Sequence, residues 1–205
     1  GRRVSVAGGA GTVVVSGGGS GIGAAVARAL GDAGYDVRAA DLTPGPGVVA
    51  LDVRDEHAWD ELLGGVDRLA GVVNCAGIRS HTSIEQMELS AWRQVVDTNL
   101  TGTFLGTRAA LRRCRAQGSG GVVVNMASVA AFVPTPHQAH YVATKGGIVA
   151  LTKSAALEGG PIGVRVHALA PGPILTPLIA RGMSDPDVLA RVQGRIPLGR
   201  IGQTG

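Results

Sequence analysis

Three side chains carry the strongest chemical signal in this chain of 205 residues, and two of them, Tyr141 and Lys145, are four positions apart. Residues at this spacing share one face of a helix. A free phenol titrates at about 10, so it is a poor proton relay at neutral pH. A positive charge about 4 Å away is worth roughly 4 kcal/mol at an effective dielectric of about 20, or about three pK units, which makes a phenol a usable general acid or base. The third side chain, Ser128, lies thirteen residues upstream of the tyrosine and has a hydroxyl group that can donate to a substrate oxygen.

A tyrosine and a lysine also fall at this spacing by chance, so the pair gains its weight from a glycine-rich segment upstream. Gly17, Gly21 and Gly23 have the spacing G-x-x-x-G-x-G, with an apolar, β-branched run before them and an alanine-rich run after them. The first run is typical of a buried strand and the second of a helix. Glycines between a strand and a helix let the backbone approach a pyrophosphate and direct helix N-terminal N–H groups at it. The segment therefore predicts dinucleotide binding; the alternative is a flexible loop, in a chain that has 33 glycines.

Strand and helix patterns alternate along the chain without a linker. We expect strands at residues 13–16, 36–40, 48–53, 69–74, 122–126 and 164–168, and helices at residues 24–33, 58–63, 90–117 and 140–157. This alternation predicts an α/β fold of the Rossmann type, a doubly wound parallel sheet between two helical layers, in a single domain over residues 1–205. Residues 174–194 are expected to form a helical excursion on the substrate side.

The composition fits this fold and disfavours several other classes of protein. Hydrophobic residues make up 45% of the chain and charged ones 17%, which suits a sheet buried on both faces rather than disorder. The net charge is +4, but the arginines are scattered and have no interleaved aromatic residues, so we expect no nucleic-acid partner. No apolar run is long enough to span a membrane, and the N-terminus lacks a signal-peptide core. Cys75 and Cys114 are too few for a disulfide framework or a metal site, so we expect no metal and a cytoplasmic location.

Several motifs in a fixed order give a more specific signal than any one of them. Beyond the glycine segment and the Tyr141/Lys145 pair, the chain contains Asp52-Val53, Asn74-Cys75-Ala76-Gly77, Asn99-Leu100-Thr101-Gly102, Asn125-Met126-Ala127-Ser128 and Pro171-Gly172-Pro173. In these motifs and their order the chain resembles the short-chain dehydrogenases/reductases, from about residue 12 to residue 203.

This resemblance implies four catalytic residues: Asn99, Ser128, Tyr141 and Lys145. Tyr141 would exchange the substrate's hydroxyl proton, Lys145 would lower the tyrosine pKa and hold the nicotinamide ribose, and Ser128 would polarise the substrate oxygen. Asn99 would mark a helix kink and hold a water that links the lysine to solvent. A serine at a strand end is also commonly a cap, and an asparagine in a helix can simply be exposed.

The resemblance also implies where a nicotinamide cofactor would bind. The expected contacts are Gly17, Gly19, Ser20, Gly21, Ile22, Gly23, Asp41, Leu42, Asp52, Val53, Asn74, Ala76, Gly77, Tyr141, Lys145, Pro171, Gly172, Ile174 and Thr176. Simpler roles are open for some of them: a turn cap for Asp41, and helix N-caps for Asp52 and Thr176.

The expected cofactor is NAD, with NADP less favoured. Asp41 ends the second predicted strand, eighteen residues after Gly23, where a carboxylate can accept from the adenosine ribose and repel a 2′-phosphate. Strand alternation places Arg38 on the opposite face from Asp41, and Ser20 is not a basic residue.

Three positions depart from the family pattern, namely Cys75, His140 and His167, and each is explained most simply as a packed or surface residue. The chain stops after a Pro197 to Gln203 segment, where family members continue with a helix and a last strand; residues 1–9 slightly resemble that strand. A homo-oligomer, tetramer or dimer, is expected from the resemblance alone.

The predicted function is hydride transfer between a nicotinamide cofactor and a small-molecule secondary alcohol or ketone. The alternatives are a 3-oxoacyl-thioester reductase, an epimerase or dehydratase that keeps its cofactor, and a non-catalytic or regulatory NAD(P)-binding protein. The substrate is left open. An apolar pocket is suggested by Phe132, Val133, Leu175, Leu178, Ile179 and Met183.

Overall fold

The computed structural model describes residues 11–204, and these contain one six-stranded, entirely parallel sheet with the strand order β3-β2-β1-β4-β5-β6. The strands are β1 (Thr12–Ser16), β2 (Asp36–Asp41), β3 (Val48–Ala50), β4 (Leu69–Asn74), β5 (Gly121–Met126) and β6 (Val164–Leu169). The predicted single-domain α/β fold of the Rossmann type is confirmed. The weak resemblance noted for residues 1–9 lies outside the described residues.

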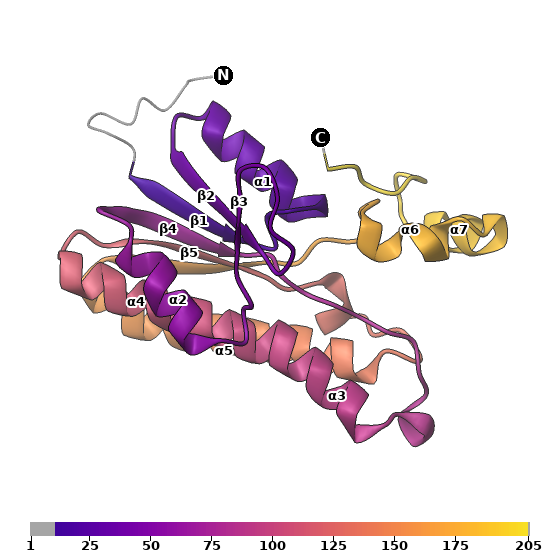
Figure 1. Ribbon diagram of the computed structural model, residues 1–205. Coiled ribbons are helices and arrows are strands. Elements are labelled where there is room, and N and C mark those ends of the chain that lie inside the picture. The colour runs from indigo at the N-terminus through magenta and orange to yellow at the C-terminus, as the bar shows by residue number, and fades with distance from the viewer. Residues whose placement is uncertain (1–10, 205) are drawn as a thin grey trace.

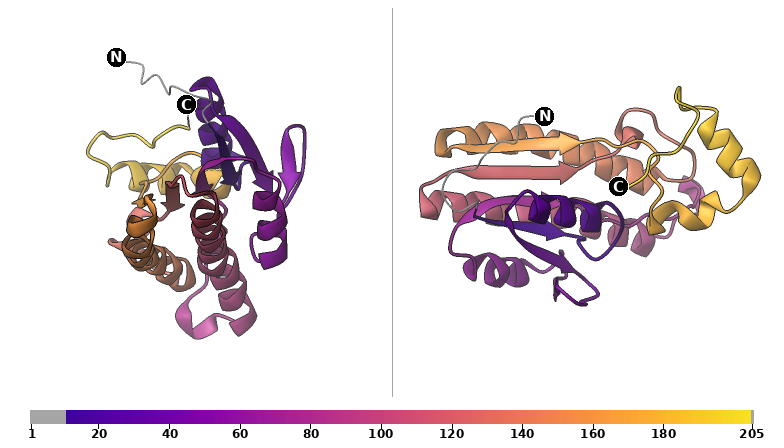
Figure 2. Two further views of the ribbon diagram at one scale, coloured as in Figure 1. Left: turned by 90° about the vertical axis from the view of Figure 1, so that its left-hand side faces the viewer. Right: turned by 90° about the horizontal axis from the view of Figure 1, so that it is seen from above.

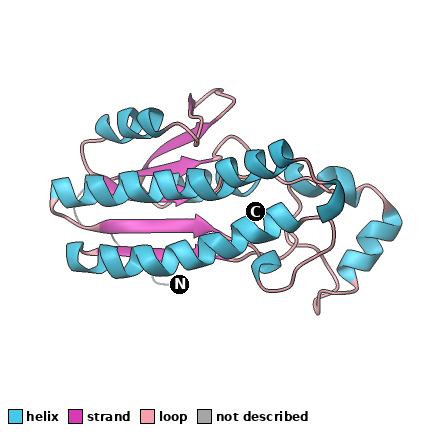
Figure 3. Ribbon diagram, turned by 90° about the horizontal axis from the view of Figure 1, so that it is seen from below, coloured by secondary structure: helices cyan, strands magenta, loops and turns pink. Residues whose placement is uncertain are grey.

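Helices cover both faces of the sheet, α1 on one face and α2, α4 and α5 on the other (Figure 1). Helices α4 and α5 run side by side under the strands (Figure 3). The α-helices are α1 (Gly21–Asp32), α2 (Glu56–Gly64), α3 (Leu89–Val96), α4 (Gly102–Gln117), α5 (Ala139–Gly159), α6 (Pro177–Met183) and α7 (Pro186–Gln193). Four short helical segments are η1 (Ile84–Gln86), η2 (Asp97–Thr101), η3 (Val129–Ala131) and η4 (Gly160–Ile162). No helix among residues 11–204 is long and apolar enough to cross a membrane.

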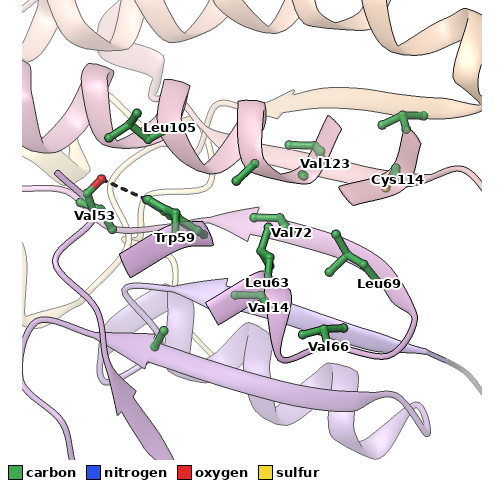
Figure 4. Packing of buried hydrophobic residues seen from close by; sticks show 14 of the residues in the cluster. Val14, Val53, Trp59, Leu63, Val66, Leu69, Val72, Leu105, Cys114 and Val123 are labelled. Atoms are coloured by element: carbon green, nitrogen blue, oxygen red, sulfur yellow. Dashed lines mark hydrogen bonds between the residues drawn. The ribbon is translucent and has the colours of Figure 1, made fainter. Parts of the chain in front are cut away.

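The core has two parts because successive residues of β1 point to opposite faces of the sheet. Val13 and Val15 pack against α1, whereas Val14 belongs to the larger cluster under α2, α4 and α5. Trp59 is the largest fully buried side chain of that cluster, and its Nε1 donates to the carbonyl of Val53 at 3.0 Å (Figure 4). This bond ties the segment after β3 to α2.

The third strand is shorter than the predicted range of 48–53. It ends at Ala50 because its only neighbour, β2, ends at Asp41, and the amide of Leu51 makes the last bond to the Asp41 carbonyl at 2.8 Å. The chain then leaves the sheet and buries Leu51 and Val53. We had expected Asp52 within this strand. It lies instead in the connection between β3 and α2.

The predicted helix over 90–117 is interrupted. Residues Asp97–Thr101 form a π-helical segment, η2, between α3 and α4, and Asn99 lies fully buried within it. Single π-helical turns inside α-helices often occur at functional sites. The helix kink expected at Asn99 coincides with this segment.

The predicted helical excursion at 174–194 is present as α6 and α7, which lie beyond the carboxyl ends of the strands (Figure 2). The chain after α7 returns to the start of this excursion. Gly202 donates to the carbonyl of Pro173 at 3.0 Å and accepts from the amide of Leu175 at 2.9 Å. Helices α6 and α7 thus form a cover beyond the carboxyl ends of the strands, and these two backbone hydrogen bonds join the start of the cover to its end.

Candidate active site

A cleft of about 1090 Å³ runs along the carboxyl ends of the strands, under α6 and α7. β1 and β4 are neighbours at the centre of the sheet, and the connections that follow them go to opposite sides. This is the switch point at which doubly wound sheets bind ligands. The cleft is lined by segments that follow β1, β2, β4, β5 and β6.

The glycine segment forms one end of the cleft. Gly17 has φ +67°, and a methyl group added there would lie 2.6 Å from the amide nitrogen of Ala76, which follows β4. A methyl group on Gly23 would collide with the carbonyl of Gly17. Only glycine allows β1, α1 and the segment after β4 to approach this closely.

The N-terminus of α1 opens into this end of the cleft. Ser20 is the N-cap residue but makes no side-chain capping bond, and Ser20, Gly21 and Ile22 all line the cleft. The N–H groups of a first helical turn have no partner within the helix, and they attract anions. The segment therefore fits the pyrophosphate of a dinucleotide.

Asp41, the last residue of β2, lies beside the glycine segment. Its Oδ2 accepts from the amide of Gly19 at 3.1 Å and its Oδ1 from the amide of Thr43 at 3.3 Å. Arg38 points elsewhere and donates to the carbonyl of Gly65 at 2.5 Å. The negative charge of Asp41 is thus held at the cleft without a cation from its own strand; Leu42 follows it in the cleft wall.

Asp52 and Val53 also line the cleft, and the Asp52 carboxylate is occupied by Arg54. Arg54 donates to it through Nε at 2.9 Å and through Nη2 at 2.6 Å. These hydrogen bonds hold the pKa of Asp52 below its usual value. The alternative role of Asp52 as an N-cap is wrong, because Asp55 caps α2 by accepting from the amides of His57 and Ala58.

The segment after β4 divides between the cleft and the interior. Ala76 and Gly77 line the cleft, whereas Asn74 is buried and donates to Asn125 Oδ1 at 2.8 Å. The Asn74 side chain is therefore part of a polar contact between β4 and β5. Cys75 lines the cleft, and burial raises the pKa of its thiol to about 12, with a weaker opposing effect from Lys145.

Tyr141 and Lys145 of α5 lie in the other end of the cleft. The Lys145 ammonium is 5.5 Å from the centre of the Tyr141 ring and donates to the carbonyl of Met126 at 2.6 Å. Lys145 is only 4% exposed. Burial lowers the pKa of Lys145 to about 8, which the charge of Cys75 opposes weakly. The lysine is thus a buried cation fixed between α5 and the end of β5.

Ser128 follows β5 and faces the same end of the cleft. Its Oγ accepts from the amide of Ala130 at 3.1 Å, so it caps η3 as the simpler interpretation suggested. A hydroxyl that accepts one bond still has its proton to donate. The cap therefore orients the side chain and leaves a donor for another oxygen.

Asn99 is fully buried and does not line the cleft. Its Oδ1 accepts from the amide of Ile78 at 2.8 Å and its Nδ2 donates to the carbonyl of Ile78 at 2.9 Å. A methyl group on Gly77 would lie 3.4 Å from Asn99 Oδ1 and 3.7 Å from Lys145 Nζ. Asn99 and Lys145 thus flank Gly77, and the exposed-asparagine interpretation is wrong.

The two histidines that depart from the family pattern are placed differently. His140 is fully buried; its Nδ1 accepts from the amide of Tyr141 at 2.8 Å, which leaves the Nε2 proton for Ser80 Oγ at 2.7 Å. His140 therefore helps to fix the start of α5. His167 is an exposed residue of β6.

The cover contributes an apolar wall and a contact with the glycine segment. Thr176 makes no side-chain capping bond at the start of α6, and a methyl group on Gly21 would lie 3.3 Å from its Cβ. Of the predicted apolar pocket, Val133, Leu178, Ile179 and Met183 line the cleft, but Phe132 and Leu175 do not.

Most of the other predicted contacts also line the cleft, including Pro171, Gly172 and Ile174. Gly19, Asn74 and Asn99 do not. Sequence reasoning missed Arg79, His81, His137 and Gln138, which line the end of the cleft near Tyr141, here called the catalytic end after its expected role. The sequence did contain one signal for Arg79. This arginine lies in the segment that follows a predicted strand, and parallel sheets bind ligands at the carboxyl ends of their strands.

The comparisons with known proteins agree with this geometry. The family model for short chain dehydrogenases matches residues 11–186. A 3beta-hydroxysteroid dehydrogenase of Eggerthella lenta is 36% identical over 93% of this chain and 81% of its own length. A trans-4-hydroxycyclohexanecarboxylate dehydrogenase of Sinomonas cyclohexanicum is 33% identical over 93% of this chain and 80% of its own.

A solved structure shows the same fold. It belongs to a candidate NAD(P)-dependent gluconate 5-dehydrogenase of Beutenbergia cavernae, with bound NADP at low occupancy, and the TM-score is 0.91 at 32% identity. The match covers 99% of this chain and 87% of the other.

The chain belongs to the short-chain dehydrogenase family. It is an NAD(P)-dependent oxidoreductase that acts on small-molecule alcohols.

Proposed function

We propose that the protein oxidises a secondary alcohol, or reduces the matching ketone, with Tyr141 as general acid and base and with NAD as the preferred cofactor. The observation that carries this proposal is one cleft that joins the glycine segment to Ser128 and Tyr141, with the Lys145 ammonium 5.5 Å from the tyrosine ring.

The cofactor would lie along the carboxyl edge of the sheet. Gly17 to Gly23 would hold its pyrophosphate, Asp41 and the segment from Leu42 to Val53 its adenosine, and Tyr141, Lys145 and the residues from Pro171 to Thr176 its nicotinamide half. Support comes from the closely packed glycines and the open N-terminus of α1. A bound nicotinamide supplies the hydride acceptor or donor, and the protein orients it.

Ser128 and Tyr141 would handle the substrate oxygen. Ser128 Oγ accepts from Ala130, so its proton is free to donate to that oxygen and hold it in place. Tyr141, in its deprotonated form, would take the hydroxyl proton of an alcohol; in the reverse direction it would return a proton to the carbonyl oxygen.

Lys145 and Asn99 would support the tyrosine. The Lys145 ammonium lies 5.5 Å from the centre of the Tyr141 ring, and its bond to Met126 fixes its position. Asn99 would hold a water that links Lys145 to solvent; the place of both residues beside Gly77 supports this role.

A preference for NAD is supported by Asp41, whose carboxylate would accept from ribose hydroxyls and repel a 2′-phosphate. Arg38 and Arg54 are engaged with Gly65 and Asp52. Similar proteins are named for steroid, hydroxycyclohexanecarboxylate and gluconate substrates, so we propose an alcohol within this range. Assembly as a homotetramer or dimer stays a prediction from the family resemblance, and a cytoplasmic location stays a prediction from the small number of cysteines.

The test is NADH formation, followed at 340 nm, with a panel of steroid, alicyclic and sugar-acid alcohols and with both NAD and NADP. Tyr141→Phe should lower turnover by about a thousandfold, because the phenol proton acceptor is lost. Its dissociation constant for NADH should stay within about twofold of wild type. Full turnover by Tyr141→Phe would reject the role of the tyrosine.

A further inference from the structure

The catalytic end of the cleft is lined by cationic side chains and by no carboxylate. Among the described residues that line the whole cleft, the only acids are Asp41, the last residue of β2, and Asp52, which follows β3 and is bound by Arg54. The end near Tyr141 contains the cationic side chains of Arg79 and Lys145; His137 lines it as well, and so does His81, whose pKa is lowered by burial. Among the described residues that line this end of the cleft, the positive charges therefore have no carboxylate to balance them, and an anionic ligand would supply the missing negative charge.

Arg79 is the cation best placed to receive it. Within residues 11–204, no carboxylate lies at ion-pair distance from its guanidinium, although the residue is partly buried. Burial lowers the pKa of Arg79, and the charge of Tyr141 raises it, so the two side chains are close enough to interact. Leaving a guanidinium partly desolvated and unpaired is costly unless a ligand completes it.

The backbone on both sides of Arg79 is fixed. Ile78 exchanges two hydrogen bonds with the buried Asn99 side chain, at 2.8 and 2.9 Å. The amide of Thr82 donates to the carbonyl of His137 at 2.8 Å, and His137 has φ +63°, a conformation that non-glycine residues rarely adopt. The segment that presents Arg79 is thus held against the segment that precedes α5.

Apolar side chains also line the cleft. They are Ile78, Val133 and three residues of α6, namely Leu178, Ile179 and Met183. Such a wall suits a carbon skeleton that separates a hydroxyl group at Tyr141 from a charged group at Arg79.

We propose that the substrate is a hydroxy acid with an apolar skeleton, whose carboxylate is bound by the Arg79 guanidinium while its hydroxyl group lies at Ser128 and Tyr141. This inference rests on the proposed function for the position of the hydroxyl group. A guanidinium binds a carboxylate through two parallel N–H···O bonds, which gives direction as well as charge.

The test uses unreactive probes, so that it does not depend on turnover. Binding of cyclohexanecarboxylate and of its neutral amide to the enzyme–NADH complex is measured by calorimetry. Wild type should bind the acid about tenfold to a hundredfold more tightly than the amide. Arg79→Gln should remove this preference and Arg79→Lys should keep part of it, while NADH binding shows that each variant is folded.

Arg28→Gln, on the exposed side of α1, is the control for the loss of one positive charge, and it should keep the wild-type preference. Equal binding of acid and amide by wild type, no binding of either, or a preference that survives in Arg79→Gln overturns the proposal. Tyr141→Phe should bind the acid as wild type does. If Tyr141→Phe remains active while the acid preference depends on Arg79, the proposed function fails and this inference on the anion site stands.

Discussion

At one end of the cleft Gly17 and the stretch from Ser20 to Gly23 form much of the surface, whereas at the other end side chains from separate segments form it. Ser128 comes from the end of β5, Tyr141 and Lys145 from α5, and Arg79 from the segment after β4. The glycine end is continuous in sequence. The catalytic end exists only once β4, β5, η2 and α5 have packed together.

The two ends should therefore respond differently to substitution. At the glycine end a change acts through space and backbone conformation, so binding and stability should fall together. At the catalytic end the buried Lys145 is held against a desolvation cost, so removing it should lower activity and raise stability. Three substitutions test whether the two ends differ in this way.

The largest effect is expected from Lys145→Met, which should lower kcat by about a thousandfold. The same change should raise the free energy of unfolding at pH 7 by about 1 to 2 kcal/mol, since the cost of burying the charge exceeds the bond lost to Met126. The folded-state pKa of Lys145 is about 8 against 10.5 in a free chain, so the unfolded state holds more protons between these values. Wild-type stability should rise through that window, and the gain from Lys145→Met should shrink there.

Urea unfolding at several pH values measures this gain. Lys153→Met, at an exposed position of the same helix, is the control and should change stability by less than about 0.5 kcal/mol. A Lys145→Met protein that is less stable than wild type at pH 7 would show that the lysine stabilises the fold.

Gly17→Ala should follow in size. Alanine at φ +67° is strained, and its methyl group would press on the Ala76 amide, so we expect a loss of about 3 kcal/mol in stability and at least about tenfold in NADH affinity. Thermal unfolding and NADH fluorescence measure the two effects.

The matched control for that variant is Gly31→Ala in α1, where a methyl group would meet nothing within 4 Å. It should gain about 0.5 to 1 kcal/mol from helix propensity and leave NADH binding unchanged. Normal NADH affinity in Gly17→Ala would show that the glycine segment does not contribute to cofactor binding.

The smallest effect is expected from Asp41→Asn, which keeps the acceptor for Gly19 but removes the charge. Wild type should prefer NAD to NADP in kcat/KM, and the substitution should reduce that ratio by about tenfold, because repulsion of a 2′-phosphate is lost. Asp32→Asn, at the exposed end of α1, should leave the ratio unchanged. A wild-type preference for NADP would contradict the role given to Asp41.

Much of the fold could be predicted because parallel strands are buried on both faces and appear as continuous apolar runs. Residues 69–74 are an example, and β4 has those bounds. The third strand was predicted too long because the apolar residues Leu51 and Val53 are buried outside the sheet, in the same core cluster as Trp59. An apolar pattern shows that a residue is buried, but it does not show what covers it.

The residues of the candidate site also fall into two groups: those placed by local geometry and those placed by contacts between distant segments. Helical spacing brought Tyr141 and Lys145 together in the prediction, because that geometry is local. The side chain of Asn74 was expected at the cofactor, yet it donates to Asn125 on the neighbouring strand, a contact that depends on the strand order. Arg79 was missed because its distinguishing property, the lack of an acidic partner near Tyr141, exists only in three dimensions.

The two backbone hydrogen bonds between Gly202 and the Pro173–Leu175 segment affect how α6 and α7 can move. Because the stretch that carries α6 and α7 leaves and rejoins the protein at one place, we expect it to swing there like a flap on a single hinge, with both helices intact. Ligand entry and exit would then be governed by a few backbone torsions around Pro173 and Gly202.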